Sequence, residues 1–311
     1  MKNNLKFNFN LTLEEIDINS YKFLYNNSEY STPFHSIEFL DSIQKSRKDL
    51  VLKFNILYLE DKILGIMPFF KKKFFPFVVV SLPYGCYGGY LYLKKDEYIF
   101  KESINKIFKS KIFFKINSYN NEIYKMIKNV RCTIQHTWVI ETSDKYENIF
   151  QRLHSKTKNQ IRKSVKEGIV VKNLLYEEEL EQVISIYSQL IKKHNIKKPY
   201  NRALFESLYK YNISSDNILF KIAKKDDKVI AYSVFLKNNF QIFYWMNASH
   251  KDYTKFNGTN AILNDIIYYS TMNKIEELNL GAIPLGNKGL EHFKKRWNAT
   301  KKSYYIFKRI F

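Results

Sequence analysis

The chain repeats one short pattern, and this internal repeat limits the folds that it can adopt. Two apolar runs within residues 50–70 flank the polar turn Glu60-Asp61-Lys62, and residues 218–236 repeat this arrangement around Asp226-Asp227-Lys228. Apolar runs on both sides of a short polar turn are typical of β-hairpins. Two such hairpins, far apart in the chain, favour two similar α/β units in tandem.

Helical patterns surround the second hairpin. Residues 178–194 repeat apolar side chains at helical spacing, residues 156–166 predict a basic helix that stops near Gly168, and residues 258–270 predict a further helix. An aromatic strand is expected at residues 240–246. This order is typical of a mixed sheet with helices on both faces.

The expected fold class is therefore α/β (α+β), with two tandem units that each hold a mixed twisted sheet flanked by helices. The polar stretch at residues 142–147 fits a boundary between them. We expect an N-terminal unit at residues 1–144 and a C-terminal unit at residues 145–311. A chain of 311 residues is long enough for two ordinary cores.

The charge of the chain restricts its partners. The formal net charge is +21, and 17% of the residues are aromatic. This balance favours an anionic partner, such as a nucleotide, tRNA, CoA or an anionic membrane surface. Alternatively, part of the positive charge reflects the base composition of the genome, because Lys, Asn, Ile, Phe and Tyr share A/T-rich codons. The spread of the charge along the whole chain favours this alternative for any single lysine.

Cysteine and histidine usage argues against disulfides and metals. Cys86 and Cys132 form no disulfide framework or metal-binding spacing, and the six histidines show no ligand spacing. The polar segment at residues 1–11 does not resemble a signal peptide. We therefore expect a cytoplasmic protein that binds no metal.

An uncharged stretch at residues 74–93 has the length of a membrane span. Pro76, further proline and glycine residues and a β-branched run argue instead for a buried strand followed by a loop. The run Lys71-Lys72-Lys73 with Phe74-Phe75 suggests peripheral contact with the inner face of a membrane.

The C-terminal segment carries the clearest binding pattern. An apolar strand at residues 278–280 runs into the Gly-rich turn 281–289, which opens a short basic helix. Glycines let the backbone approach a ligand, and the first turn of a helix presents free N–H groups. Lys294 and Arg296 would hold phosphate or carboxylate. A loop followed by a solvated basic helix is the alternative.

Four segments together resemble the FemAB-like acyltransferases of the GNAT superfamily. The C-terminal segment is similar to the family's closing motif, Gly-Leu followed by Phe-Lys-x-x-Trp-Gly; Asn298 replaces the last Gly, and Asn also tolerates a left-handed backbone. In the order of the family, the other three motifs correspond to Thr32-Pro33-Phe34-His35-Ser36, to Ser81-Leu82-Pro83-Tyr84-Gly85-Cys86-Tyr87-Gly88-Gly89 and to residues 153–169, where Lys158 replaces the first Arg.

This resemblance implies tandem GNAT-like units, with the acceptor on the N-terminal side and the acyl donor on the C-terminal side. GNAT enzymes bind the donor pyrophosphate on backbone amides where a strand passes into a helix. The comparable residues are Gly258, Thr259 and Asn260, although Lys255 and Asn260 depart from the family pattern. A plain helix N-cap at Asn257 or Thr259 is the alternative.

Acyl transfer needs a neutral amine, a polarised carbonyl and a stabilised oxyanion. Lys294 is the first candidate to stabilise the developing charge or to hold donor phosphate, with support from Arg296. Tyr244 and Asn247 are further catalytic candidates, but they lie on opposite faces of a regular strand unless a bulge intervenes. Glu291 is the nearest candidate base, or else a carboxylate favoured by the helix dipole.

In the first unit, the resemblance implies that Tyr84, Tyr87, Gly88 and Gly89 face the acceptor; the alternative is an aromatic turn packed on the core. The expected function is an N-acyltransferase that moves an acyl group from acyl-CoA to an amino group of a cell-envelope precursor, such as an amino sugar. One alternative is an aminoacyl-tRNA-dependent enzyme that builds peptidoglycan cross-bridges. Others are a non-catalytic basic protein that binds RNA or membrane, and a transferase that has lost its chemistry. The donor is a substrate, so no permanently bound cofactor is expected.

Overall fold

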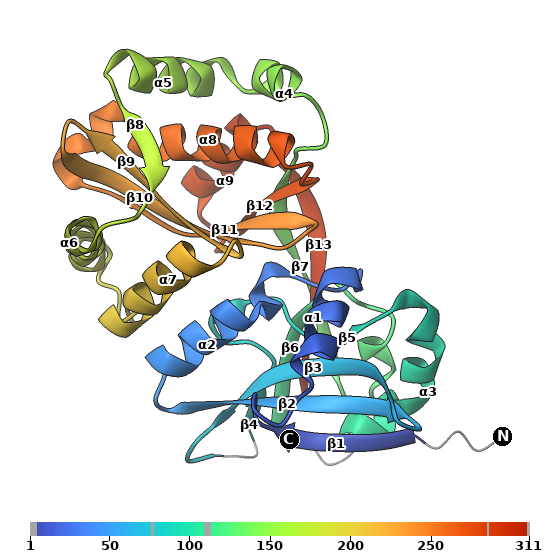
Figure 1. Cartoon of the computed structure of the whole chain (residues 1–311). Coiled ribbons are helices and arrows are strands. Elements are labelled where there is room, and N and C mark those ends of the chain that lie inside the picture. Colours follow the sequence, from blue (N-terminus) through green and yellow to red (C-terminus); the bar gives the residue numbers. More distant parts are fainter. Residues whose placement is uncertain (1–4, 76–77, 109–112, 285, 310–311) are drawn as a thin grey trace. The chain divides into compact units, whose positions relative to one another are not determined.

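The structure is a computed structural model that describes residues 5–75, 78–108, 113–284 and 286–309. The chain divides into two compact units (Figure 1). Unit 1 comprises Met1–His136 and Ser303–Phe311, and unit 2 comprises Thr137–Lys302. Each unit is a mixed sheet flanked by helices, which confirms the expected fold class. Pro76, which interrupts the uncharged stretch of the sequence, lies outside the described residues.

Unit 1 has the strand order β1-β2-β3-β4-β6-β13, and β5 pairs with β3. Neighbouring strands are antiparallel except for β4 and β6, which are parallel. The strands are β1 (Leu5–Leu11), β2 (Leu50–Leu59), β3 (Lys62–Lys72), β4 (Val78–Val80), β5 (Leu91–Tyr92), β6 (Phe113–Ser118) and β13 (Thr300–Arg309), and the helices are α1 (Ile18–Asn27), α2 (Ile37–Ser46) and α3 (Glu97–Phe108).

Unit 2 has the strand order β7-β12-β11-β10-β9-β8, in which only β11 and β12 are parallel. The strands are β7 (Arg131–Glu141), β8 (Val170–Asn173), β9 (Ile218–Lys225), β10 (Lys228–Lys237), β11 (Gln241–Ser249) and β12 (Glu277–Ala282), and the helices are α4 (Tyr146–Arg152), α5 (Ser155–Lys166), α6 (Glu177–His194), α7 (Arg202–Ser214), α8 (Gly258–Met272) and α9 (Lys288–Arg296). The helices expected from the sequence correspond to α5, α6, α8 and α9.

The two predicted hairpins are confirmed, and they have the same turn. Leu59 pairs with Lys62 in β2–β3, and Lys225 pairs with Lys228 in β9–β10, so each turn has two residues. The first turn residue has a positive φ in both hairpins, 56° at Glu60 and 53° at Asp226. Such turns match the twist of the flanking strands. The orders β1-β2-β3-β4-β6 and β8-β9-β10-β11-β12 also share the same sequence of three antiparallel pairs and one parallel pair.

The last strand of each sheet comes from a distant part of the sequence: β7 completes the sheet of unit 2, and β13 completes the sheet of unit 1. β7 comes directly after the strands of unit 1, yet its residues from Thr137 onward pair with β12. β13 comes after β12, yet Tyr305 to Arg309 pair with β6. The units therefore divide at residues 136/137 and 302/303, whereas the sequence suggested a single division at 144/145. Residues 303–311 group with unit 1 because β13 hydrogen-bonds to β6.

Helices cover both faces of each sheet (Figure 1). In unit 1, Tyr21 of α1 packs against Phe54 on one face of the sheet. On the other face, Phe100 of α3 stacks on Tyr92 within the hydrophobic core. In unit 2, α8 lies between α5 and the sheet, and α6 and α7 lie on the opposite face. No helix in the described part of the chain has the length and apolarity needed to cross a membrane.

Gly258 lets α8 start directly against the hairpin of unit 2. A Cβ atom at this position would lie 3.0 Å from the Cβ of Ala231, 3.2 Å from Cδ1 of Ile230 and 3.3 Å from the Cβ of Ala223. All three neighbours are fully buried, so they have little room to move. Any larger residue here would have to displace these neighbours, so glycine favours close packing of α8 on the sheet.

We expect Gly258→Ala to lower the free energy of unfolding by about 1–3 kcal/mol, because the added methyl overpacks the contact between α8 and the sheet. Gly289→Ala is the matched control, since a Cβ there meets only Asn287 Oδ1, at 3.7 Å. The control should be neutral or stabilising by up to about 1 kcal/mol. Urea unfolding measures both variants; equal stability changes would contradict this packing role.

Candidate active site

The parallel strands β11 and β12 of unit 2 separate at their carboxyl ends. Their pairing covers Gln241 to Phe243 on β11 and Glu277 to Asn279 on β12. Beyond it, β11 stays with β10 as far as Ser249, and β12 stays with β7 as far as Ala282. Ligands of open α/β sheets bind where neighbouring strands part in this way. The candidate donor-side residues lie on β11, at the start of α8 and on α9.

Lys294 of α9 is buried at the end of β12. Its side chain is 2% exposed, and its ammonium donates to the carbonyl oxygens of Gly281 at 2.7 Å and Ala282 at 3.0 Å. No carboxylate in the described part of the chain forms an ion pair with it. Burial lowers the pKa of Lys294 to about 8. A lysine in this environment keeps its charge at neutral pH and has a third N–H donor that the two carbonyls do not use.

Asn279 holds in place the backbone whose carbonyls accept the hydrogen bonds of Lys294. This fully buried amide accepts hydrogen bonds through Oδ1 from the Thr137 hydroxyl at 2.6 Å and from the Gly281 N–H at 2.8 Å. Gly281 has a φ of +80°, which turns the chain out of the strand. Asn279 carries no signal in the sequence that marks it as part of a site, and its role becomes visible only once β7 and β12 are paired.

A bulge in β11 brings Tyr244 and Asn247 to the same face of the sheet. Tyr244 pairs with Phe235 and Met246 pairs with Val234, so Trp245 is the additional residue. Asn247 pairs with Ser233, which lies on the same side of β10 as Phe235. Tyr244 is 8% exposed, and burial raises the pKa of its hydroxyl, so the phenol stays protonated; Asn247 is exposed.

The start of α8 leaves donors available. Asn257 occupies the N-cap position with a left-handed backbone, and its side chain does not cap the helix. Its carbonyl accepts from the N–H groups of Asn260 and Ala261, whereas the amides of Gly258 and Thr259 find no acceptor among the described residues. Because β11 and β12 are parallel and each leads toward a helix, α8 and α9 both begin on the side of the sheet where the two strands part.

The other predicted residues of α9 have separate surroundings. Arg296 is half-buried, and its Nε makes no hydrogen bond within the described chain. Its position two residues after Lys294 points it to a different side of the helix. Its carbonyl accepts from the His154 N–H at 3.0 Å, which anchors α5. Glu291 is paired with Lys295 at 2.8 Å on the surface, as a helix-start carboxylate would be.

In unit 1, two of the sequence motifs meet. The Thr32 hydroxyl donates to the Tyr87 carbonyl at 2.9 Å, and the His35 Nε2 lies 3.3 Å from the Gly89 carbonyl. His35 Nδ1 accepts from the Thr32 N–H, so Nε2 carries the proton and donates. Burial lowers the pKa of His35 to about 4, so this link is neutral. The motif at residues 32–36 therefore positions the predicted acceptor loop.

The members of that loop differ in exposure. Tyr87 is 3% exposed, with ring contacts to Tyr119 and Tyr304 at 4.7 Å each. Tyr84 is exposed beneath the Arg47 guanidinium, which lies 5.5 Å from the ring centre. Gly88 and Gly89 leave no space for a Cβ, which would meet Ser81 Oγ at 2.3 Å and Tyr124 Oη at 2.4 Å, respectively. Only Tyr84 of these side chains stands open to a ligand.

Other chemistries have less support in the described residues. The Cys86 thiol is buried, and burial raises its pKa, so it is a poor nucleophile. Across the described ranges, no cluster of three His, Cys, Asp or Glu side chains could hold a metal ion.

Solved structures with this fold come from several kinds of protein. FemX has a TM-score of 0.72 at 11% identity, covering 95% of this chain and 96% of that one. The C-terminal domain of a putative lysylphosphatidylglycerol synthetase from Agrobacterium fabrum has a TM-score of 0.61 at 8% identity, covering 89% and 87%. A tandem GNAT protein from the clavulanic acid biosynthesis pathway has a TM-score of 0.54 at 8% identity, covering 98% and 97%. At these identities the similarity shows the fold alone.

A search of curated protein sequences gave no significant match. The model of the FemAB-like family, described as peptidoglycan biosynthesis/recognition, matches residues 93–306, more than half of the chain. Family and fold together support an acyltransferase of cell-wall biosynthesis. The chain thus belongs to the FemAB-like family.

Proposed function

We propose that the protein transfers an acyl group from acyl-CoA to an amino group of a cell-envelope precursor, such as an amino sugar. The observation that carries this proposal is the buried ammonium of Lys294, whose partners among the described residues are two backbone carbonyls at the point where β11 and β12 part. A buried cation without an anionic partner is costly for stability. An anionic group that forms during the reaction would offset that cost.

The proposed role of Lys294 follows from the charge changes of acyl transfer. The neutral amine of the acceptor attacks the acyl carbonyl carbon, and the carbonyl oxygen becomes an oxyanion. The third N–H of Lys294 donates to this oxyanion. When the tetrahedral intermediate collapses, the bond to the CoA sulfur breaks, and the proton lost by the amine neutralises the thiolate. Tyr244, protonated and on the same face as Asn247, is the proposed relay: its hydroxyl gives a proton to the leaving sulfur and takes up the proton that the amine loses.

The donor phosphates have two candidate contacts. The amides of Gly258 and Thr259 have no acceptor in the described ranges, and the positive end of the α8 dipole lies at the same place. Among the described residues, no carboxylate forms an ion pair with Arg296, so its side chain supplies a positive charge on α9. Lys255, next to this helix start, lies on the surface with its Nζ 5.2 Å from the ring centre of Phe256. These groups fit a pyrophosphate better than they fit an apolar ligand.

An aminoacyl-tRNA donor is the second candidate, with peptidoglycan cross-bridge synthesis as the function. The family's description and the net charge of +21 favour it. The step at Lys294 would be the same, with a ribose oxygen of the tRNA in place of the CoA sulfur as the leaving group. In both cases we place the protein in the cytoplasm, where either donor is made.

Donor binding separates these candidates. We expect calorimetry at physiological salt to show saturable binding of acetyl-CoA, and tRNA binding that is lost in salt and does not depend on the aminoacyl group. Tight binding that requires the aminoacyl group would instead support the cross-bridge enzyme. Binding of RNA alone, with neither donor recognised, would leave a non-catalytic protein and overturn the proposal.

Lys294→Met should lower kcat about 10²–10³-fold, because the variant removes one oxyanion donor. The reaction is followed with acetyl-CoA as donor and glucosamine as the probe acceptor. Lys295→Met is the matched control, since Lys295 is an exposed neighbour whose ion pair is with Glu291 on the surface. The control should retain activity within about twofold. A folded Lys294→Met protein with wild-type activity would remove Lys294 from the mechanism.

The pKa of Lys294 gives a second test. Below about pH 8 the ammonium is charged, and above it the charge is lost, whereas an arginine stays charged throughout. The ratio of kcat/KM between wild type and Lys294→Arg should therefore be constant below pH 8 and fall about tenfold per pH unit above it. Taking the ratio cancels the ionisation of the acceptor amine. A ratio that stays flat to pH 9.5 would show that the charge of Lys294 is not needed.

A further inference from the structure

One edge of the unit 1 sheet, the one formed by the ends of its strands, carries cations and exposed aromatic rings that the proposed acyl transfer does not use. β3 ends at this edge with Lys72, and β13 ends there with Arg309, which pairs with Phe114 near the start of β6. β4 and β6 are parallel and begin together, with Val78 opposite Phe113. From β3 to β13 are three strand spacings, about 14 Å. The ends of these four strands therefore lie side by side in unit 1.

The β3–β4 loop presents two phenylalanine rings at this edge. Phe74 is 79% exposed and Phe75 is 65% exposed. Backbone hydrogen bonds fix the start of the loop: the Lys73 N–H donates to the Asp49 carbonyl at 2.9 Å, and the Phe75 N–H donates to the Lys72 carbonyl at 3.3 Å. The exposed rings therefore follow a hydrogen-bonded turn, and the exposed side chains of Lys72 and Lys73 come directly before them in the sequence.

The charge of this loop is not balanced locally. The Asp49 carboxylate lies near Lys72, but it is bound by Arg47 at 2.6 Å. Neither Lys72 nor Lys73 forms an ion pair with any carboxylate in the described ranges. Two adjacent lysines and two adjacent exposed phenylalanines suit a surface that is negatively charged outside and apolar beneath.

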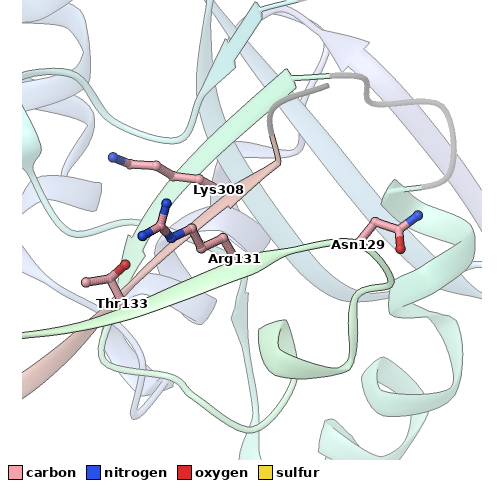
Figure 2. Close-up of a pocket in the computed structure, with 4 residues that line it drawn as sticks. All are labelled: Asn129, Arg131, Thr133 and Lys308. Atoms are coloured by element: carbon pink, nitrogen blue, oxygen red, sulfur yellow. The ribbon is translucent and has the colours of Figure 1, made fainter.

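A basic pocket lies at the same edge (Figure 2). It has a volume of about 440 Å³ and is lined by Asn129, Arg131, Thr133 and Lys308. Arg131 and Thr133 lie on the first part of β7, up to His136, which belongs to unit 1. Figure 2 shows that the side chains of Arg131 and Lys308 extend in the same direction, beside Thr133. Lys115 pairs with Lys308 across β6 and β13, and burial together with the charge of Lys308 lowers the pKa of Lys115.

The pocket has the chemistry of a phosphate site. Arg131 supplies a planar fork of donors, Lys308 a second positive charge and Thr133 a hydroxyl. In the described part of the chain, no carboxylate forms an ion pair with Arg131, Lys115 or Lys308. Three cations this close repel one another, and a bound anion would relieve the repulsion.

We propose that this edge of unit 1 binds the surface of an anionic lipid bilayer. Phe74 and Phe75 enter the interface, Lys72 and Lys73 lie among the headgroups, and the pocket between Arg131 and Lys308 holds the phosphate of one lipid. The backbone of a paired RNA could satisfy the cations, but its stacked bases would leave the two adjacent phenylalanines without an apolar environment. Unpaired RNA bases can stack on aromatic rings, and the tRNA measurement below tests for that occupant. The inference is independent of the acyl donor, and it would bring the enzyme to precursors that are carried on lipid.

Co-sedimentation with phosphatidylcholine vesicles, with and without phosphatidylglycerol, tests the proposal on the full chain. Wild type should bind only the vesicles with phosphatidylglycerol. We expect Phe74→Ser/Phe75→Ser and, separately, Arg131→Gln/Lys308→Gln to weaken binding on the order of tenfold or more. Lys192→Gln/Lys193→Gln is the matched control, because it removes the same charge from exposed positions at the end of α6 and should change binding less than about twofold.

Each outcome has a defined meaning. If wild type fails to bind, or the α6 control weakens binding as much as the Arg131/Lys308 variant, the surface is not a lipid site. If the Phe74/Phe75 variant binds the vesicles normally but loses affinity for tRNA, the occupant is RNA and the proposal is wrong.

Displacement of wild type from vesicles by millimolar glycerol phosphate, but not by chloride at equal ionic strength, would support a phosphate in the pocket. No acyl donor is present in these assays, so their failure would not touch the proposed acyl transfer.

Discussion

The short parallel pairing between β11 and β12 determines most of the donor-side site. The register covers three residues on each strand, after which each strand follows its other neighbour. Separation of the strands leaves the carbonyls of Gly281 and Ala282 without a partner on β11, and Lys294 supplies one from α9. The two hydrogen bonds that satisfy the last carbonyls of β12 therefore also place the Lys294 ammonium where β11 and β12 separate. Structure and proposed chemistry depend here on one interaction, so the structural and catalytic effects of a substitution at Lys294 have to be measured separately.

The four motifs noticed in the sequence meet in two pairs. Residues 32–36 hold the glycine loop of unit 1 through Thr32 and His35. Residues 153–169 contact the closing motif of unit 2, where the His154 N–H and the Thr157 hydroxyl both donate to the Arg296 carbonyl. One member of each pair fixes the backbone of the other. This explains why several of their residues are small, buried or neutral rather than reactive.

Local patterns predicted much of the fold. The two hairpins and the helices α5, α6, α8 and α9 could be read from periodicity and turn chemistry because these depend on neighbouring residues. The left-handed Asn298, whose φ is 57°, followed instead from the family resemblance, in which a Gly stands at this position. The candidate site was accessible only in part. Lys294 could be named from its motif, but its carbonyl partners, the support from Asn279 and the bulge at Trp245 arise from strand pairing between distant segments. The assignment of β13 to unit 1 depends on the same kind of long-range pairing, which no local pattern encodes.

The exchange of β7 and β13 has a consequence for how the chain folds during its synthesis. The sheet of unit 1 cannot be finished when its own sequence has left the ribosome, because β6 waits for a strand that is made after the whole of unit 2. Until then, β6 presents an open edge, which is a template for pairing with other chains. Loss of the last strand to truncation or early termination would leave that edge permanently uncovered. Such a product would be aggregation-prone even though every residue of the candidate donor site had been made.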